Sequence, residues 1–162
     1  MDTGFFGKLP AAGDFVSRGI PAGARAALDH WLTHEIAPLA HNAGGWPEGG
    51  VRAAVILSDA PWLLVIEPSV DAVDRRYPLV VCCPLGHADR SGADVWADAA
   101  WSAILKSTEE HADADTLAGL LQRVCLPTAG AEPLIPPVMW WDNTPPGPVA
   151  PQLALLAKIS SG

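Results

Sequence analysis

Three apolar runs within Val51–Leu85 constrain this chain more than any other feature, because they predict a sheet at its centre. The runs are Val51–Leu57, Trp62–Ile66 and Leu79–Cys83, and they are rich in the β-branched and aromatic residues that favour strands. Only Ser58-Asp59-Ala60-Pro61 separates the first two runs. That connection is so short that the two strands must lie side by side and antiparallel.

The loop between the second and third strands, Glu67–Arg76, places charges between buried segments and is the first candidate for function. Its charged residues include two carboxylates and two guanidiniums, those of Asp71, Asp74, Arg75 and Arg76. These groups can close on one another as a stabilising network, or they can face outward and recognise a partner. The structural interpretation is favoured for Asp71, whose carboxylate can accept backbone N–H groups and fix the turn after Pro68. One of the two arginines is then expected to be spare.

With 162 residues the chain can bury about 70% of its unfolded surface in one core, so we expect a single domain over residues 1–162. Ten Lys and Arg against eighteen Asp and Glu give a net charge of −8. This charge would repel a phosphate backbone, which argues against nucleic-acid binding and favours a partner with a basic surface. Residues 89–115, here called the acidic face, hold seven of the carboxylates: Asp89, Asp94, Asp98, Glu109, Glu110, Asp113 and Asp115.

The cysteines and the N-terminus indicate a cytoplasmic protein. Of the three cysteines, Cys82 and Cys83 are adjacent in an apolar strand, where their side chains must point to opposite faces. Buried thiols in a reduced compartment are therefore expected, and no disulfide framework. The N-terminal residues lack a basic region followed by an apolar one, and no run approaches the length of a membrane span, so membrane insertion is not expected.

The N-terminal segment 4–21 is broken by glycines and prolines into short extended pieces. We expect Phe5–Lys8 to pair at a sheet edge and the rest of the segment to lie across the core. The charged residues Lys8, Asp14 and Arg18 are then expected on turns, exposed to solvent.

Helices are predicted before and after the central strands. Apolar residues at three- and four-residue spacing predict an amphipathic helix from Ala24 to about Pro38, and others over about 93–111 and 117–126. We expect Val138–Trp141 to form a short edge strand between prolines and Gln152–Ile159 to form one or two helical turns. Since strands and helices do not alternate, the expected class is α/β of the α+β type, with a mostly antiparallel central sheet flanked by helices. The closest familiar architectures are profilin-like or longin-like.

Catalytic and metal-binding patterns are largely missing. His30 and His34 have the spacing at which two imidazoles can share a zinc ion, but no third ligand is evident, so a solvated helix face is expected. There is no nucleophile elbow and no glycine-rich phosphate or dinucleotide loop. Ser69, two residues before Asp71, is more typical of a turn hydrogen bond than of a nucleophile. We therefore expect no catalytic residue, no cofactor and no metal.

Three segments together resemble the TagF (ImpM) family, which is associated with bacterial type VI secretion. They are GFFGKLPAAGDFVSRGIP at 4–21, followed by Trp31-Leu32; PSVDAVDRRYPL at 68–79; and Trp140-Trp141. The family pattern has the same order and similar spacing over nearly the whole chain. Two departures stand out: Asp74 occupies a position where the pattern has glycine, and the loop 42–50 replaces a longer insertion.

The resemblance implies a cytoplasmic accessory protein without catalysis, which represses type VI secretion after translation by binding the forkhead-associated-domain scaffold protein of the apparatus. Our own inference for the contact residues is Lys8, Asp14, Asp71, Asp74, Arg75 and Arg76, together with the acidic face. An alternative from another class is a small-ligand sensor or hydrolase, with a pocket near Asp14, Asp71 and Arg75.

Overall fold

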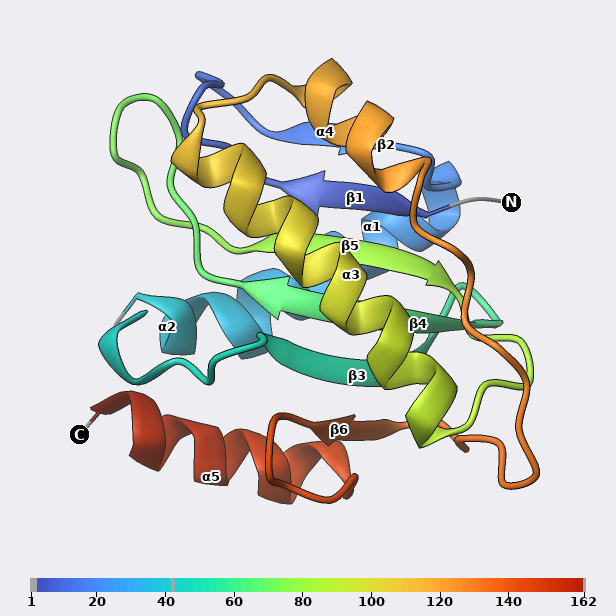
Figure 1. Ribbon diagram of the computed structural model, residues 1–162. Coiled ribbons are helices and arrows are strands. Elements are labelled where there is room, and N and C mark those ends of the chain that lie inside the picture. The colour runs from blue at the N-terminus through green and yellow to red at the C-terminus, as the bar shows by residue number, and fades with distance from the viewer. Residues whose placement is uncertain (1–2, 42, 162) are drawn as a thin grey trace.

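The computed structural model describes residues 3–41 and 43–161; position 42, at the start of the predicted loop 42–50, lies outside the described residues. Within them, six strands form one sheet in the order β2-β1-β5-β4-β3-β6, and every neighbouring pair is antiparallel (Figure 1). Helices pack on both faces of this sheet. The α+β class with a mostly antiparallel sheet is confirmed, while the profilin-like or longin-like comparison stays a prediction.

The central hairpin is the one that the apolar runs predict. Strand β3 (Val51–Leu57) pairs with β4 (Ala60–Glu67), and β5 (Leu79–Pro84) pairs with β4 on its other side. The turn between β3 and β4 consists of Ser58 and Asp59, both with positive φ (51° and 67°). Two consecutive residues with positive φ make the tight turn that matches the twist of an antiparallel pair.

The N-terminal segment differs from its prediction. Strand β1 (Gly4–Gly7) lies between β5 and β2 (Val16–Arg18), so β2 is the edge and the expectation that Phe5–Lys8 forms the sheet edge is wrong. The chain returns after β1 and pairs Phe5 with Arg18. A strand of three residues is too short for its alternation of apolar and polar side chains to be recognised in a sequence.

Two core clusters fill the two sides of the sheet. Helices α3 (Arg90–Glu109) and α4 (Ala114–Leu121) cover one face, as Figure 1 shows in front of the strands. Helices α1 (Ala22–Trp31), α2 (Ala37–Ala40) and α5 (Val149–Ser161) cover the other. Cys83 belongs to the first cluster and Cys82 to the second, so the two buried thiols point to opposite faces, as strand geometry requires.

The first helical segment ends at Ala40, close to its predicted end near Pro38. A π-helical stretch, Leu32–Ile36, joins α1 to α2, and Pro38 stands in the first turn of α2. Proline is tolerated at that position because the first N–H groups of a helix have no partner within it. At the other end of the chain, α5 has 13 residues rather than one or two turns, and β6 (Val138–Trp140) forms the predicted edge strand beside β3.

Candidate functional site

The carboxylate of Asp71 holds the loop Glu67–Arg76 in place. Its side chain has no exposed surface. Its Oδ1 accepts hydrogen bonds from the backbone N–H groups of Val73 (3.0 Å) and Arg75 (2.9 Å). Its Oδ2 accepts from Lys8 Nζ at 3.0 Å and from Arg75 Nε at 2.7 Å. These contacts support the interpretation that the Asp71 carboxylate fixes the turn of the loop.

The same contacts determine the charge state of Asp71. Burial acts to raise the pKa of its carboxyl, but the hydrogen bonds from the backbone of Arg75, from Lys8 and from Val73 outweigh burial and hold the pKa well below its usual range. A carboxylate that keeps its charge in this way is a poor proton acceptor at neutral pH. Its role here is to bind donors from two parts of the chain.

The position of Lys8 differs from its prediction. It was expected on an exposed turn, yet only 6% of its surface is exposed. Its ammonium group is paired with Asp71 and lies 5.0 Å from the centre of the Phe15 ring. A buried lysine is retained because a carboxylate and an aromatic ring compensate its charge. Ser69 Oγ donates to Lys8 O at 2.7 Å, which is a structural hydrogen bond and agrees with the interpretation of this serine.

The other candidate contact residues differ in how many hydrogen bonds they form with the rest of the protein. Arg75 Nη2 donates to Gly13 O at 2.7 Å, so this arginine ties the loop to the N-terminal segment. Arg76 is exposed and donates one hydrogen bond to His41 O. Asp74 is exposed with φ of 64°, a conformation that glycine adopts readily, which explains why the family pattern has glycine there. Asp14 is exposed and accepts from the N–H of Phe15.

The structure thus brings the N-terminal segment beside the central loop, as the alternative hypothesis requires. Neither of the two pockets described next is lined by Asp14, Asp71 or Arg75. The Asp71 carboxylate is also fully buried and occupied by donors.

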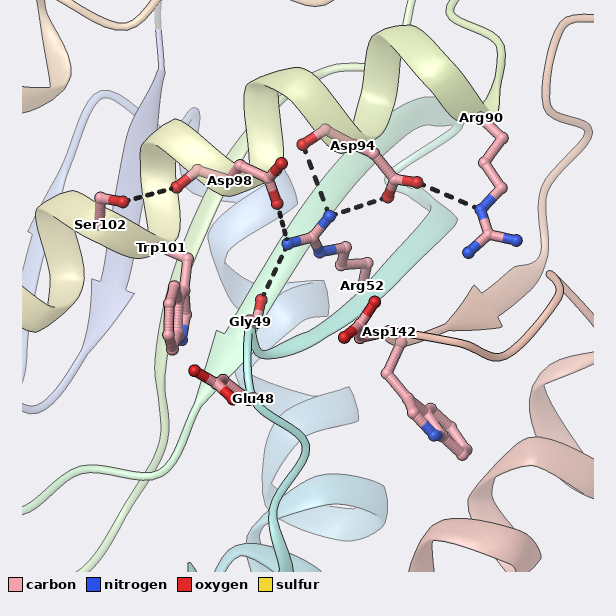
Figure 2. Close-up of a pocket in the computed structure, with 10 residues that line it drawn as sticks. Glu48, Gly49, Arg52, Arg90, Asp94, Asp98, Trp101, Ser102 and Asp142 are labelled. Carbon is pink, nitrogen blue, oxygen red and sulfur yellow. Dashed lines mark hydrogen bonds and ion pairs between the residues drawn. The ribbon is translucent and has the colours of Figure 1, made fainter.

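A first pocket, here called the acidic pocket, lies between α3, the loop before β3 and the residues after β6 (Figure 2). Its volume is about 430 Å³. It is lined by four carboxylates, two guanidiniums and two indoles among its ten residues: Glu48, Gly49, Arg52, Arg90, Asp94, Asp98, Trp101, Ser102, Trp141 and Asp142. Carboxylates therefore outnumber cationic groups, and the pocket favours a ligand of positive charge.

Arg52 is the centre of this pocket. Only 7% of its surface is exposed, and its guanidinium donates to Asp94 Oδ1 at 2.8 Å and to Asp98 Oδ1 at 2.6 Å. It also donates to Gly49 O at 3.2 Å. Figure 2 shows Asp94 and Asp98 reaching from α3 toward Arg52, with Glu48 and Asp142 on the other side of its guanidinium. Arg52 thereby joins β3 to the first turns of α3.

Sequence reasoning missed Arg52, Glu48 and Asp142, although it included Asp94 and Asp98 in the acidic face. One signal was available: Arg52 is the only charged residue in the apolar run Val51–Leu57, and a cation in a buried strand requires a partner. Asp94 and Asp98 stand four residues apart on the predicted helix, so both can reach the same cation. Which of the acidic residues would meet Arg52 depends on where α3 crosses the sheet.

Other members of the acidic face have local roles. Asp89 caps α3 by accepting the N–H of Gly92 at 2.8 Å, and Asp113 caps α4 through Thr116 N at 2.8 Å. Asp115 pairs with Arg18 of β2 at 3.2 Å on the exposed surface. The acidic face is therefore not one uniform patch, and its enclosed part is the acidic pocket.

A second pocket, here called the apolar pocket, has a volume of about 400 Å³ and lies between the central loop and the C-terminal half of α3. It is lined by Pro10, Ala40, Glu67, Pro68, Ser69, Val70, Arg76, Leu105 and Thr108. Burial raises the pKa of Glu67 to about 7, although the hydrogen bond from Trp101 Nε1 to its Oε2 (2.7 Å) acts in the opposite direction. This carboxyl is the group in the pocket that changes charge near neutral pH.

His30 and His34 do not form a metal site with other residues. The centroids of their rings lie 4.2 Å apart with the rings tilted by 34°, and His34 Nδ1 lies 2.8 Å from the carbonyl oxygen of His30. Over residues 3–41 and 43–161, no group of three or more His, Cys, Asp or Glu side chains is arranged to hold a metal ion.

The sequence model of the TagF N-terminal domain, described as type VI secretion system-associated, matches residues 4–124. The chain belongs to the TagF family. The matched range includes every residue of the Asp71 network and most of the acidic pocket, whereas β6, α5 and the pocket residues Trp141 and Asp142 lie beyond it.

A solved structure has a similar fold. The crystal structure of PA0076 from Pseudomonas aeruginosa PAO1 has a TM-score of 0.64 with this TagF chain at 27% sequence identity. The similarity covers 98% of this chain and 77% of the other, so it includes the C-terminal elements that the family model leaves out. No curated protein matches the sequence.

Among the described helices of this TagF protein, none combines the length and the apolar character needed to cross a bilayer.

Proposed function

We propose that this TagF-family protein is a non-enzymatic, post-translational repressor of type VI secretion, which acts in the bacterial cytoplasm by binding the forkhead-associated-domain scaffold protein of the apparatus. The observation that carries the proposal is the match of the TagF N-terminal domain over residues 4–124, which contains both of the charged, motif-bearing segments. We propose further that residues 1–162 act as one domain, since β2, close to the N-terminus, and β6, close to the C-terminus, belong to the same sheet.

The mechanism that we propose is occupancy: the bound repressor covers a surface that the scaffold protein needs for assembly. The contacts of the central loop support a binding role rather than a catalytic one. Asp71 is surrounded by donors and its pKa is lowered, so it is not placed to act as a general base. Its bonds to Lys8 and Arg75 instead fix the loop, and a rigid loop loses little entropy when a partner binds.

The candidate contact residues divide into two groups by their surroundings. Lys8 and Asp71 are buried and fix the loop from within, whereas Arg75 binds Asp71 and Gly13 O with 60% of its side chain exposed. Asp74, Arg76 and Asp14 are exposed and available to a partner. The sensor or hydrolase alternative receives no comparable support, because the Asp71 carboxylate is enclosed and occupied.

The repression is tested by measuring type VI secretion in the source bacterium with the gene deleted and with the protein overproduced. The proposal expects higher secretion on deletion and lower secretion on overproduction, with unchanged levels of the secretion proteins. Secretion that does not respond to either change would refute repression.

The loop contact is tested by the charge reversals Asp74→Lys and Arg76→Glu, assayed for repression and for affinity to the scaffold protein. Arg75 is left intact because reversing its charge would place a carboxylate beside Asp71. A matched control is Glu109→Lys with Lys106→Glu, which reverses one charge of each sign on α3 outside the loop. Folded loop variants that bind and repress as well as the control would remove Asp74 and Arg76 from the contact surface.

A further inference from the structure

We infer that the acidic pocket receives a basic side chain, arginine or lysine, from a segment of the protein partner. The inference rests on the proposed function, because it requires a protein partner. It specifies which type of side chain that partner places in the acidic pocket. It concerns residues outside the central loop, on β3, α3 and the two loops that close the pocket.

The first support is the set of acceptors that the fold leaves free. Asp94 is already engaged, because its Oδ1 accepts from Arg52 and from Trp140 Nε1 (2.8 Å) and its Oδ2 accepts from Arg90 Nε (3.2 Å). Asp98 has only its Oδ1 bonded to Arg52, and its side chain is 72% exposed. A carboxylate held in position on one oxygen and open on the other is prepared for a second cation.

Two further carboxylates complete this set. Glu48 lines the pocket without a hydrogen bond or ion pair among the described residues, and Asp142 accepts only a long contact of 3.5 Å from Asn143 Nδ2. Figure 2 shows both on the side of Arg52 opposite α3. The pocket therefore presents free carboxylate oxygens from two sides, which matches the fork of donors on a guanidinium or the three donors of an ammonium group.

The second support is an unpartnered donor in a buried side chain. The side chain of Arg52 is 9% exposed, and its Nε has no hydrogen-bond partner among the described residues. Arg90, which also lines the pocket, binds Asp94 through Nε and is 39% exposed, and its terminal nitrogens have no bonded acceptor among the described residues. The donors of the partly exposed Arg90 side chain can bind carbonyl oxygens, which a peptide supplies and a bare metal ion does not. The combination of open acceptors and open donors fits a basic peptide segment.

The third support is the apolar part of the lining. Trp101 lines the pocket with a partly exposed side chain, and an indole attracts guanidinium and ammonium groups that lie over it. The methylene groups of an arginine or lysine can bury against the same ring. A volume of about 430 Å³ accommodates one such side chain together with its adjoining backbone. The net charge of −8 draws a basic partner toward the protein at long range.

The test compares two variants with the same change in net charge. Glu48→Gln/Asp98→Asn/Asp142→Asn removes the three free carboxylates of the pocket. Glu35→Gln/Glu109→Gln/Glu110→Gln removes three exposed carboxylates elsewhere. Titration with the purified scaffold protein is expected to show at least a roughly tenfold loss of affinity for the pocket variant and a smaller salt dependence, with little change for the control. Equal affinities of the two variants would overturn the inference.

A second measurement separates this inference from the identity of the partner. N-acetyl-arginine amide is titrated into the labelled full-length protein, with the uncharged analogue N-acetyl-citrulline amide as control, and the indole N–H resonances of Trp101 and Trp141 are followed. Saturable shifts with the arginine probe alone, lost in the pocket variant, are expected even if the scaffold protein does not bind. If the scaffold protein fails to bind while these shifts occur, the proposed partner is wrong and the pocket assignment holds. Identical responses to the two probes would refute the pocket assignment.

Discussion

Lys8 Nζ lies 3.0 Å from Asp71 Oδ2, and this ion pair joins the end of β1 to a loop 63 residues later in the chain. Both side chains are buried. The pair connects the two motif segments of the TagF family, which are far apart in the sequence, and Arg75 strengthens the connection through Gly13 O. The motifs therefore have a structural explanation that does not depend on catalysis.

The first prediction concerns the loss of this pair. Asp71→Asn leaves the buried ammonium of Lys8 without a counter-charge, and it weakens the two hydrogen bonds that Oδ1 accepts from the backbone N–H groups of Val73 and Arg75. We expect the Tm to fall by on the order of 10 °C. Because the pKa of Asp71 is lowered, its contribution to stability is complete above the unfolded-state pKa and is lost as pH falls toward the folded-state pKa. The deficit of the variant should therefore shrink in acid.

Asp74→Asn is the matched control, since it makes the same chemical change three residues later at an exposed side chain. Its Tm should stay within about 2 °C of the parent protein, as for most surface substitutions. Thermal unfolding of both variants at neutral and acidic pH checks the prediction. Similar Tm values for the two variants would contradict the central role given to the Lys8–Asp71 pair.

The second prediction concerns Gly7, in the motif segment just before Lys8. Its φ is 137°, and a Cβ added there would lie 2.1 Å from Pro78 O. Alanine at this position requires the backbone of β1 or β5 to move, so Gly7→Ala should lower the free energy of unfolding by more than about 2 kcal/mol. Chemical denaturation measures the loss.

Gly13→Ala serves as its control, because no atom lies within 4 Å of the added Cβ. Its stability should be unchanged or slightly increased, since alanine reduces the conformational freedom of the unfolded chain. If Gly7→Ala proves as stable as Gly13→Ala, the close approach of β1 to Pro78 is incorrect.

The third prediction concerns Glu67. Burial raises the pKa of its carboxyl from 4.5 to about 7. Between these values the folded state holds a proton that the unfolded state releases, so stability falls as pH rises. Glu67→Gln removes this dependence and can still accept the hydrogen bond from Trp101. The variant should match the parent near pH 5 and exceed it near pH 8 by up to about 3 kcal/mol. A constant difference between the two proteins across this pH range would contradict the buried, protonated carboxyl.

The sheet could be predicted from the sequence where apolar runs and tight turns carry a strong signal. The hairpin of β3 and β4, strand β5 and the buried positions of Cys82 and Cys83 follow from such runs. Strand β2 and the position of β1 inside the sheet could not be predicted, because three- and four-residue strands give no detectable period. The π-helical stretch Leu32–Ile36 could not be predicted, because such a stretch has no simple sequence signal.

The candidate site could likewise be predicted only in part from the sequence. The role of Asp71 could be predicted because turn hydrogen bonds are local in sequence. The burial of Lys8 could not, because it depends on a contact between distant segments. The acidic pocket depends on where α3 crosses β3 and on residues after β6, and only the tertiary structure brings these together.

The binding of the scaffold protein is the central claim of this account, and titration of the two purified full-length proteins tests it most directly. The forkhead-associated-domain protein from the same type VI gene cluster is titrated with this protein, and complex formation is followed by calorimetry and size-exclusion chromatography. The account predicts a stoichiometric complex that weakens when salt is raised, because charged residues contribute to the contact. Two folded proteins that form no complex would contradict it.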